Sequence, residues 1–350
     1  MSQPSTPRVS VVMPVYNGAT YLDEAIESVL QQDFADFEFV IVDDGSRDRT
    51  PEILASWAAR DPRIVLLRND VNRGISHALN VGLAAARGEY IARQDADDIA
   101  MQGRFTLEVE LLDRERDVVL VSMNYEVITE DGVVIERARV SRPEVLIRWR
   151  FLFSNAIGGH GQVMFRRSVV QELGGYSEDA RWAEDYELWT RMLTRGRIVV
   201  LPQIGMRYRM HGSRSSEIWG TEQKFSGGRI AQRALQNLLQ RDVDEGEAHA
   251  VRHLWGLHLQ RNRAAVAHRT MREAYAVFTR NLPPSDATLI RRKCAAQFIY
   301  VGALMLSRGA VGEMLTHFRY GLAWNVAGAL GGCVEAFDAM RMFVWRRMRR

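Results

Sequence analysis

Short apolar segments alternate with amphipathic ones along the first hundred residues, and this alternation constrains the fold more than any other feature. The apolar segments, which predict strands, span residues 9–15, 37–42, 64–67 and 90–93. Helical spacing of apolar residues follows over about residues 21–31, from Thr50 onward, and over 74–87. Strands that alternate with helices in this way are typical of a parallel sheet covered on both faces. The sequence therefore predicts an α/β domain with a Rossmann-like sheet.

Polar side chains follow the ends of these predicted strands. They are Asn17, Asp43, Asp44, Asp95 and Asp97. In open α/β sheets, ligands bind beyond the carboxyl ends of the strands, where the strand order reverses. We therefore expect these five side chains to converge on one crevice.

The segment around Asp95 and Asp97 predicts a divalent metal site. In an extended segment, residues two apart point the same way, so these two carboxylates would share one side while Asp98 points elsewhere. Two oxygen ligands leave room around Mg²⁺ or Mn²⁺ for the phosphate oxygens of a substrate. The pattern thus predicts a metal that holds a phosphate-bearing ligand.

The pattern changes after residue 100. Residues 118–121 and 133–135 flank an Asp131-Gly132 turn and predict a hairpin. From about Thr221 onward the sequence is almost wholly helical in pattern. With 350 residues, the chain is long enough for two domains. We expect the α/β domain to span residues 1–220 and a helical domain to span 221–350.

Composition predicts a cytoplasmic protein. The two cysteines provide neither a disulfide framework nor a zinc-binding spacing, which suits a reducing compartment. The first residues lack the apolar core of a secretory signal. The longest uncharged stretches, 294–307 and 320–334, fall short of the ~20 apolar residues that span a bilayer.

The last ten residues contain five arginines and no acid. A helix there would place Phe337, Met340 and Phe343 on one face and arginines on the others, a pattern that predicts contact with an anionic membrane surface at the inner face of the cell membrane. The alternative is that this region packs on the protein or forms a homo-oligomer interface. A net charge of only +3 and the lack of a recognised motif argue against nucleic acid as a partner.

Six short motifs occur in a characteristic order. They are Val11-Val12-Met13-Pro14-Val15-Tyr16-Asn17, Val42-Asp43-Asp44-Gly45-Ser46, Asn72-Arg73-Gly74 through Asn80, Asp95-Ala96-Asp97-Asp98, Trp182-Ala183-Glu184-Asp185 and Tyr208-Arg209-Met210-His211. Over roughly residues 9–216 the chain resembles the family 2 inverting glycosyltransferases of the GT-A fold. The resemblance implies a mixed, mostly parallel sheet that binds a nucleotide sugar. It also implies transfer of a sugar from a UDP-linked donor to a saccharide or glycolipid hydroxyl in cell-surface polysaccharide biosynthesis.

The resemblance implies roles for the residues of these motifs. Asp43 accepts from a uracil imide N–H, and Asp44 steadies either the turn or the ribose. Asp97 is the direct ligand of Mn²⁺ or Mg²⁺, and Asp95 is its partner, through water or the ribose. Asp185 is the base that removes the acceptor proton, with Glu184 beside it. The remaining candidates are Pro14, Tyr16, Asn17, Arg73 and Arg93 toward the donor, His211 at the metal or diphosphate, and Trp182 and the glycine-flanked loop residue His160 on the acceptor side.

Other readings stay open at this level. A nucleotidyltransferase could use the same metal–diphosphate contacts, although its chemistry needs no acceptor base at Asp185. A non-catalytic scaffold of a polysaccharide-assembly complex is a second alternative, and the presence of Asp95, Asp97 and Asp185 argues against it. The donor base also stays open, because guanine or thymine would suit the same diphosphate site.

Overall fold

The computed structural model describes residues 6–212, 220–254 and 262–330, which form parts of two compact units. The first unit comprises Met1–Ile147 and Asn155–Gln223, and the second comprises Arg148–Ser154 and Lys224–Arg350. The short segment Arg148–Ser154 thus belongs to a different unit from the residues on either side of it. The amphipathic helix expected at residues 337–350 lies outside the described residues.

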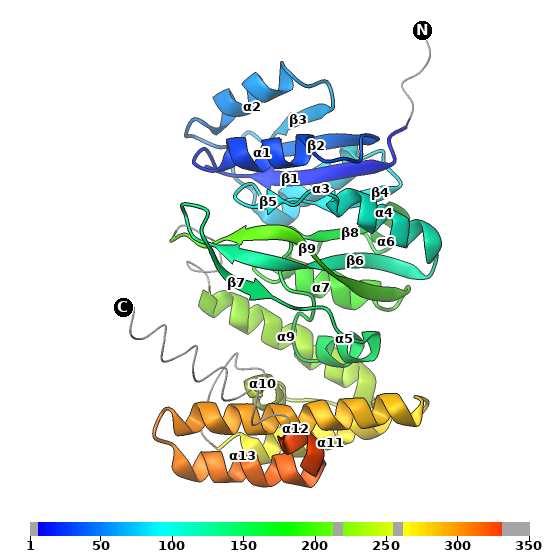
Figure 1. The fold of residues 1–350 in the computed structure, drawn as a ribbon, viewed down its shortest axis with the longest axis vertical. Helices are drawn as coiled ribbons and strands as arrows, with labels where there is room; N and C mark the ends of the chain where they lie inside the picture. The colour runs from blue at the N-terminus through cyan, green and yellow to red at the C-terminus, as the bar shows by residue number, and fades with distance from the viewer. Residues whose placement is uncertain (1–5, 213–219, 255–261, 331–350) are drawn as a thin grey trace. The chain divides into compact units, whose positions relative to one another are not determined.

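The first hundred residues form the predicted alternation of strands and helices (Figure 1). The elements are β1 (Val9–Val15), α1 (Leu22–Leu30), β2 (Phe37–Asp43), α2 (Thr50–Ala58), β3 (Ile64–Arg68), α3 (Ile75–Ala85) and β4 (Tyr90–Arg93). β1 pairs in parallel with β2 and β4, and β2 pairs in parallel with β3. The predicted α/β arrangement is confirmed.

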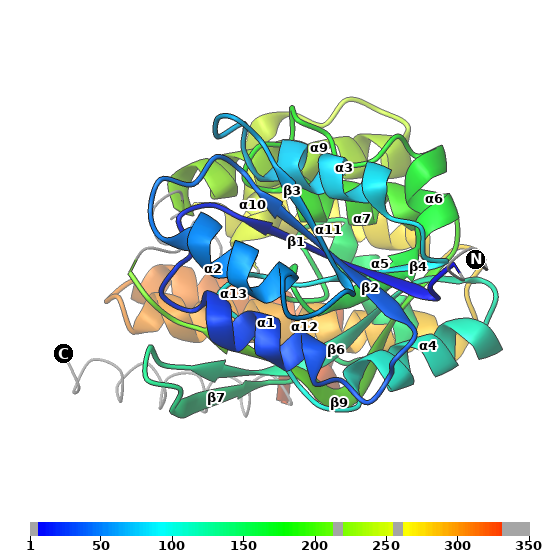
Figure 2. The ribbon, with the colours of Figure 1, turned by 90° about the horizontal axis from the view of Figure 1, so that it is seen from above.

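Helices cover both faces of this parallel region. Val11 of β1 faces the core that Ile26 of α1 completes. Val12 faces the opposite side, where a Cβ added at Gly82 of α3 would lie 2.6 Å from its Cγ1 atom. Figure 2 accordingly shows α1 and α3 on opposite sides of β1. A strand buried on both faces is apolar at most positions, which explains why Ser10 is the only polar residue of β1.

The rest of the first unit extends and curls the sheet. Its elements are β5 (Ile99–Ala100), α4 (Arg104–Arg114), β6 (Val118–Ile128), β7 (Val134–Ala138), the start of α5 (Glu144–Phe151), β8 (Val163–Arg166), α6 (Arg167–Glu172), α7 (Glu184–Met192) and β9 (Arg197–Arg209); α5 continues into the second unit from Arg148. The strand order is β3-β2-β1-β4-β8-β6-β9-β5, with β7 paired to β6. β8 runs antiparallel to both β4 and β6, whereas β6 and β9 are parallel. The sheet is therefore mixed, and the predicted hairpin at Asp131-Gly132 joins β6 to β7.

The second unit is helical, as the sequence predicts. Its helices are α9 (Gly220–Leu239), α10 (Glu245–His253), α11 (Ala264–Phe278), α12 (Pro284–Leu306) and α13 (Val311–Trp324). Trp149, from the short inserted segment, is buried and its ring lies edge-on to that of Phe278 at 5.3 Å. That contact explains why the segment belongs to this unit. Among the helices that the structure describes, none is both long and apolar enough to cross a membrane.

Candidate active site

Three loops meet at the carboxyl edge of the parallel strands. β1 lies between β2 and β4, so the loops after all three strands leave from neighbouring positions. Val15 is directly opposite Asp43, and the backbone N–H of Gln94 donates to the carbonyl of Val12. The strand order reverses at β1 and β4, which is where open α/β sheets bind ligands. The topology thus brings Asn17, Asp43 and the segment around Asp95 to one edge.

The loop after β1 is tied to the loop after β2. The backbone N–H of Asn17 donates to Ser46 Oγ at 2.9 Å. The Asn17 side-chain oxygen accepts from the backbone N–H of Arg47 at 2.9 Å. Asn17 has a φ of 50°, a left-handed conformation that asparagine tolerates better than most residues. Its neighbour Tyr16 is 47% exposed and Pro14 is half-buried at the end of β1.

Asp43 and Asp44 are both buried and have different hydrogen-bond partners. Asp43 Oδ1 accepts from the N–H of Ser46, while Oδ2 lies 3.3 Å from Arg68 Nε and has no hydrogen-bond donor among the described residues. Asp44 accepts from Asn69 Nδ2 and from the backbone N–H groups of Arg73 and Gly74. Asp44 thus holds the loop from β3 to α3, and these contacts test neither of its expected roles, at its own turn or at a ribose. Asp43 Oδ2 is buried beside the Arg68 guanidinium group.

Arg73 and Arg93, both expected at phosphate, have different surroundings. Arg73 is exposed at the start of α3. Arg93 is only 1% exposed and its guanidinium pairs with Asp95 Oδ1 at 2.7 Å. Arg93 is therefore held inside the protein by a carboxylate, and its contact with a phosphate stays a prediction. Sequence could not show this, since an arginine at the end of a strand is usually exposed.

The acidic segment after β4 is a turn rather than an extended strand. β4 ends at Arg93, and the N–H of Asp98 lies 3.5 Å from the carbonyl oxygen of Asp95. The alternation argument for Asp95 and Asp97 is thus wrong, although each carboxylate has a defined partner. Asp98 is buried and accepts from the backbone N–H of Arg209, away from the other two, as expected.

Asp97 contacts His211, which follows β9. Asp97 Oδ2 and His211 Nε2 are 2.9 Å apart, and 35% of the Asp97 side chain is exposed. Arg209 holds the two segments together, because its Nε donates to the carbonyl of Asp97 at 3.1 Å and its backbone N–H donates to Asp98. The sequence analysis assigned no role to Arg209. Its place in the same motif as His211 was the available signal.

Asp97 and His211 suit a divalent cation whose remaining ligands come from a substrate. A carboxylate oxygen and an imidazole nitrogen both suit Mn²⁺, and the carboxylate alone suits Mg²⁺. Within the described parts of the chain, no group of three or more histidine, cysteine or acidic side chains is placed to hold a metal. A cation here would therefore need further oxygens, such as those of a diphosphate.

Asp185, at the start of α7, carries the properties of a general base. Its Oδ2 accepts from Asn155 Nδ2 at 2.8 Å, and the side chain is half-buried. Burial raises the pKa of Asp185 to about 6, and the nearby charge of Asp95 adds to the rise. A carboxyl group with a pKa near neutrality can take up a proton and release it again. The sequence analysis did not identify Asn155, which has no motif around it.

Glu184 and His160 form a buried cluster with Tyr176. Burial raises the pKa of Glu184 to about 8, with the charge of Asp185 as the second cause. His160 Nε2 lies 2.8 Å from the Tyr176 hydroxyl, and Nδ1 lies 3.9 Å from Glu184. Burial holds the pKa of His160 well below its usual value, so the ring is neutral. His160 lies on a loop, as expected, and only 9% of its side chain is exposed. Trp182 is half-buried beside this cluster, with a φ of 71°.

The glycines around His160 have a packing reason. Gly161 approaches the donor-side loop so closely that an added Cβ would lie 2.6 Å from Asp95 Oδ2. Gly158 has a φ of 88°, and its carbonyl accepts from Asn155 Nδ2. The loop that carries His160 therefore runs between Asp95 and the residue that holds Asp185. Donor-side and acceptor-side candidates belong to one site.

Comparison with known proteins identifies the chain as a glycosyltransferase. The model of glycosyl transferase family 2 matches residues 10–174. EpsE of Bacillus subtilis, a glycosyltransferase by name, is 36% identical over 195 residues, which are 55% of this chain and 69% of that protein. The succinoglycan biosynthesis protein ExoO of Rhizobium meliloti is 33% identical over 223 residues, or 61% of this chain and 63% of that protein. The chain belongs to glycosyl transferase family 2.

Solved structures share the fold. TarS residues 1–349 from S. aureus, in complex with UDP-GlcNAc, aligns with a TM-score of 0.56 at 17% identity, over 91% of this chain and 92% of that one. The mannosyltransferase PcManGT from Pyrobaculum calidifontis, in complex with GDP-Man and Mn²⁺, aligns with a TM-score of 0.53 at 22% identity, over 92% and 87%. The expected GT-A fold is thereby confirmed.

Proposed function

We propose that this enzyme is a metal-dependent inverting glycosyltransferase that moves a sugar from a UDP-linked donor to a hydroxyl group of a saccharide or glycolipid. The observation that carries the proposal is the half-buried Asp185, held by Asn155 and with a pKa raised to about 6. Asp95 connects this carboxylate electrostatically to the donor side. A nucleotide-binding edge and a base therefore share one site.

The proposed reaction is a single displacement. The Asp185 carboxylate accepts the proton of the acceptor hydroxyl while that oxygen bonds to the anomeric carbon of the sugar. The bond from the anomeric carbon to the diphosphate oxygen breaks, and its electron pair leaves with the nucleoside diphosphate. Attack opposite the leaving group converts an α-linked donor into a β-glycoside.

Residues at the sheet edge suit the donor. Asp43 Oδ2 is the proposed acceptor for a uracil N–H. It is buried and lies 3.3 Å from Arg68 Nε, so the base would share this atom with the guanidinium group. Asp97 and His211 would hold a divalent cation, with Asp95 beside them. When bound, such a cation stabilises the negative charge that develops on the leaving diphosphate. Arg73 is exposed at the start of α3 and can reach phosphate oxygens.

The saccharide acceptor is proposed from the side chains near Asp185 and from the name of a relative. Trp182 can stack on a sugar ring, and the succinoglycan relative places a family member in polysaccharide synthesis. We extend this to polysaccharide assembly at a membrane surface, where a lipid-linked acceptor would be presented. Nucleotidyl transfer is the competing reaction, and it would release pyrophosphate instead of a nucleoside diphosphate.

The pH dependence of transfer tests the proposed base. Asp185 must be ionised, so kcat/KM should be constant above about pH 6 and fall with a slope of one below it. Asn155 donates to the charged form and thereby lowers the pKa of Asp185, so Asn155→Ala should move the midpoint upward by about one pH unit.

The pH profile distinguishes two roles of Asn155: setting the pKa of Asp185, or only maintaining the structure of the loop. Asn155 also orders its own loop, because its side-chain oxygen accepts from the N–H of Ile157. Disruption of the loop alone would lower kcat/KM at every pH without moving the midpoint. Asn155→Asp keeps that acceptor and adds a negative charge, so it should move the midpoint further than Asn155→Ala. An unmoved midpoint in both variants contradicts Asp185 as the base.

A further inference from the structure

α13 in the second unit presents an apolar face to solvent. Val311, Leu315 and Leu322 are 52%, 60% and 51% exposed, and their spacing of four and seven residues places them on one side of a helix. Buried His317 and Trp324 lie on the opposite side. After a break at Asn325, two more exposed apolar residues follow, Val326 at 61% and Leu330 at 65%. We call the exposed apolar residues 311, 315, 322, 326 and 330 the α13 face.

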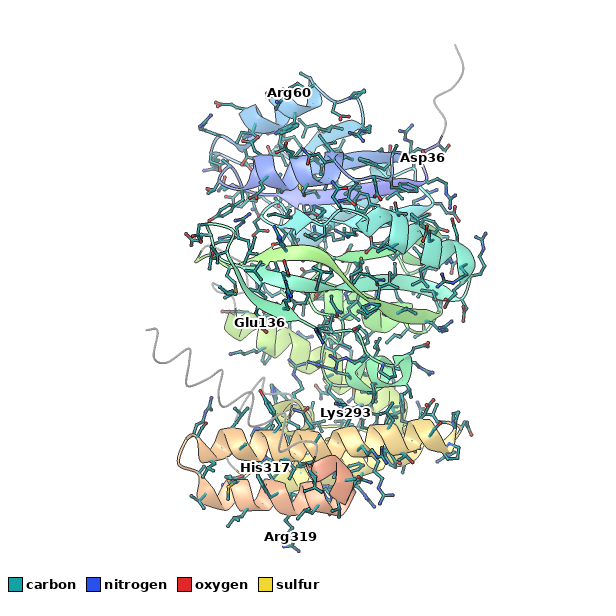
Figure 3. The ribbon with its side chains drawn as sticks, in the orientation of Figure 1. Asp36, Arg60, Glu136, Lys293, His317 and Arg319 are labelled. Carbon is teal, nitrogen blue, oxygen red and sulfur yellow. The ribbon has the colours of Figure 1, made fainter. Side chains whose placement is uncertain are left out.

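Two of the three charged side chains near the α13 face are positive. Between residues 306 and 330 the charged side chains are Arg308, Glu313 and Arg319. Both arginines are exposed, while Glu313 is half-buried and accepts from the backbone N–H of Asn262. Figure 3 shows Arg319 projecting away from the helices of this unit, whereas His317 points in among them. The sequence that follows the face ends in five further arginines within ten residues.

We propose that the α13 face is a docking surface for an anionic lipid bilayer. Apolar side chains on one side of a helix, flanked by arginines, match the interfacial helices that lie at the boundary between headgroups and acyl chains. Arginine reaches from such a position to the lipid phosphates while its stem stays in the apolar layer. The inference rests on the proposed function only in explaining why a membrane location would serve the enzyme.

A second copy of the chain fits the same face less well. In a two-fold interface the same patch meets itself, so Arg319 would be buried against apolar side chains or another Arg319. No exposed acid among residues 306–330 could pair with it. A buried, unpaired guanidinium is costly, whereas a lipid phosphate supplies the missing negative charge.

Co-sedimentation of the full chain with vesicles tests the proposal. The vesicles are phosphatidylcholine alone or phosphatidylcholine with phosphatidylglycerol. We expect binding to the anionic vesicles, a reduction of about 10-fold or more for Leu315→Glu with Leu322→Glu, and weaker dependence on lipid charge for Arg319→Glu. The matched control is Val133→Glu with Ile135→Glu, two residues of the first unit that are 56% and 41% exposed. The control should bind as the wild type does.

Three outcomes would overturn the proposal. One is equal binding of the α13 variant and the control to the anionic vesicles. Another is equal binding of the wild type to neutral and anionic vesicles. The third is a dimer in solution, without vesicles, that the α13 variant converts to a monomer, since the face would then join two copies. UDP binding is measured by calorimetry on the same variants. If the wild type does not bind UDP, that result counts against the proposed function. The role of the α13 face in docking is decided by vesicle binding alone.

Discussion

Asp185→Asn is expected to reduce sugar transfer by on the order of 10²-fold or more, while donor binding stays nearly unchanged. The amide has almost the size of the carboxylate, and its oxygen can still accept from Asn155 Nδ2, while its NH2 group replaces the oxygen that accepts from the backbone N–H of Tyr186. What the variant loses is a group that takes up the acceptor proton. Initial rates of transfer and calorimetric titration with UDP measure the two effects separately.

Glu184→Gln is the matched control for this substitution. Burial and the charge of Asp185 raise the pKa of Glu184 to about 8, so its carboxyl is mostly neutral at pH 7. The amide therefore changes neither the size nor the charge of this position, and transfer should fall by less than about 10-fold. Near-normal transfer by Asp185→Asn, or an equal loss in both variants, would remove Asp185 as the base.

Asp97→Ala is expected to abolish the dependence of UDP binding on Mn²⁺. Asp97 would supply the carboxylate oxygen, and His211 Nε2, 2.9 Å from it, the imidazole nitrogen. With two protein ligands, loss of one leaves the cation held almost entirely by the diphosphate and water. Isothermal titration with UDP, with Mn²⁺ or with a chelator, should show a metal-dependent gain in the wild type and almost none in the variant. GDP titrated in parallel tests the choice of base.

Two further variants make the metal prediction specific. His211→Ala removes the nitrogen ligand and should weaken the Mn²⁺ effect in the same direction. Asp70→Ala removes an exposed carboxylate from the end of the neighbouring β3 and should retain the full effect. Equal UDP affinity of the wild type with Mn²⁺ and with the chelator would contradict the metal assignment.

The parallel half of the fold follows from local sequence. β1 and β4 lie where the largely apolar runs predict strands, because a strand buried on both faces needs mostly apolar side chains. The mixed half is less local. The parallel pairing of β6 with β9 joins residues about 80 apart in sequence, and periodicity holds no information about such partners. The assignment of Arg148–Ser154 to the second unit depends in the same way on a distant contact of Trp149.

The site shows the same division between local motifs and distant contacts. Motifs located Asp43, Asp97 and Asp185, because each follows a strand or begins a helix in a recognisable pattern. Burial could not be predicted from the sequence: Arg93 was expected at phosphate and His160 on an acceptor-side loop, and both side chains are largely buried. Asn155 has no motif, and only the folded chain brings it to within 2.8 Å of Asp185. Supporting contacts of this kind are set by tertiary structure.

Product analysis by NMR tests the central claim most directly. The enzyme is incubated with Mn²⁺ and α-linked UDP-sugars in turn, with water as the acceptor when no saccharide is supplied. Phosphorus spectra distinguish UDP from pyrophosphate, and early proton spectra show the anomeric configuration before the free sugar equilibrates. We predict UDP together with a β-configured product. Release of pyrophosphate, or a product that retains the α configuration, would contradict the proposed inverting transfer.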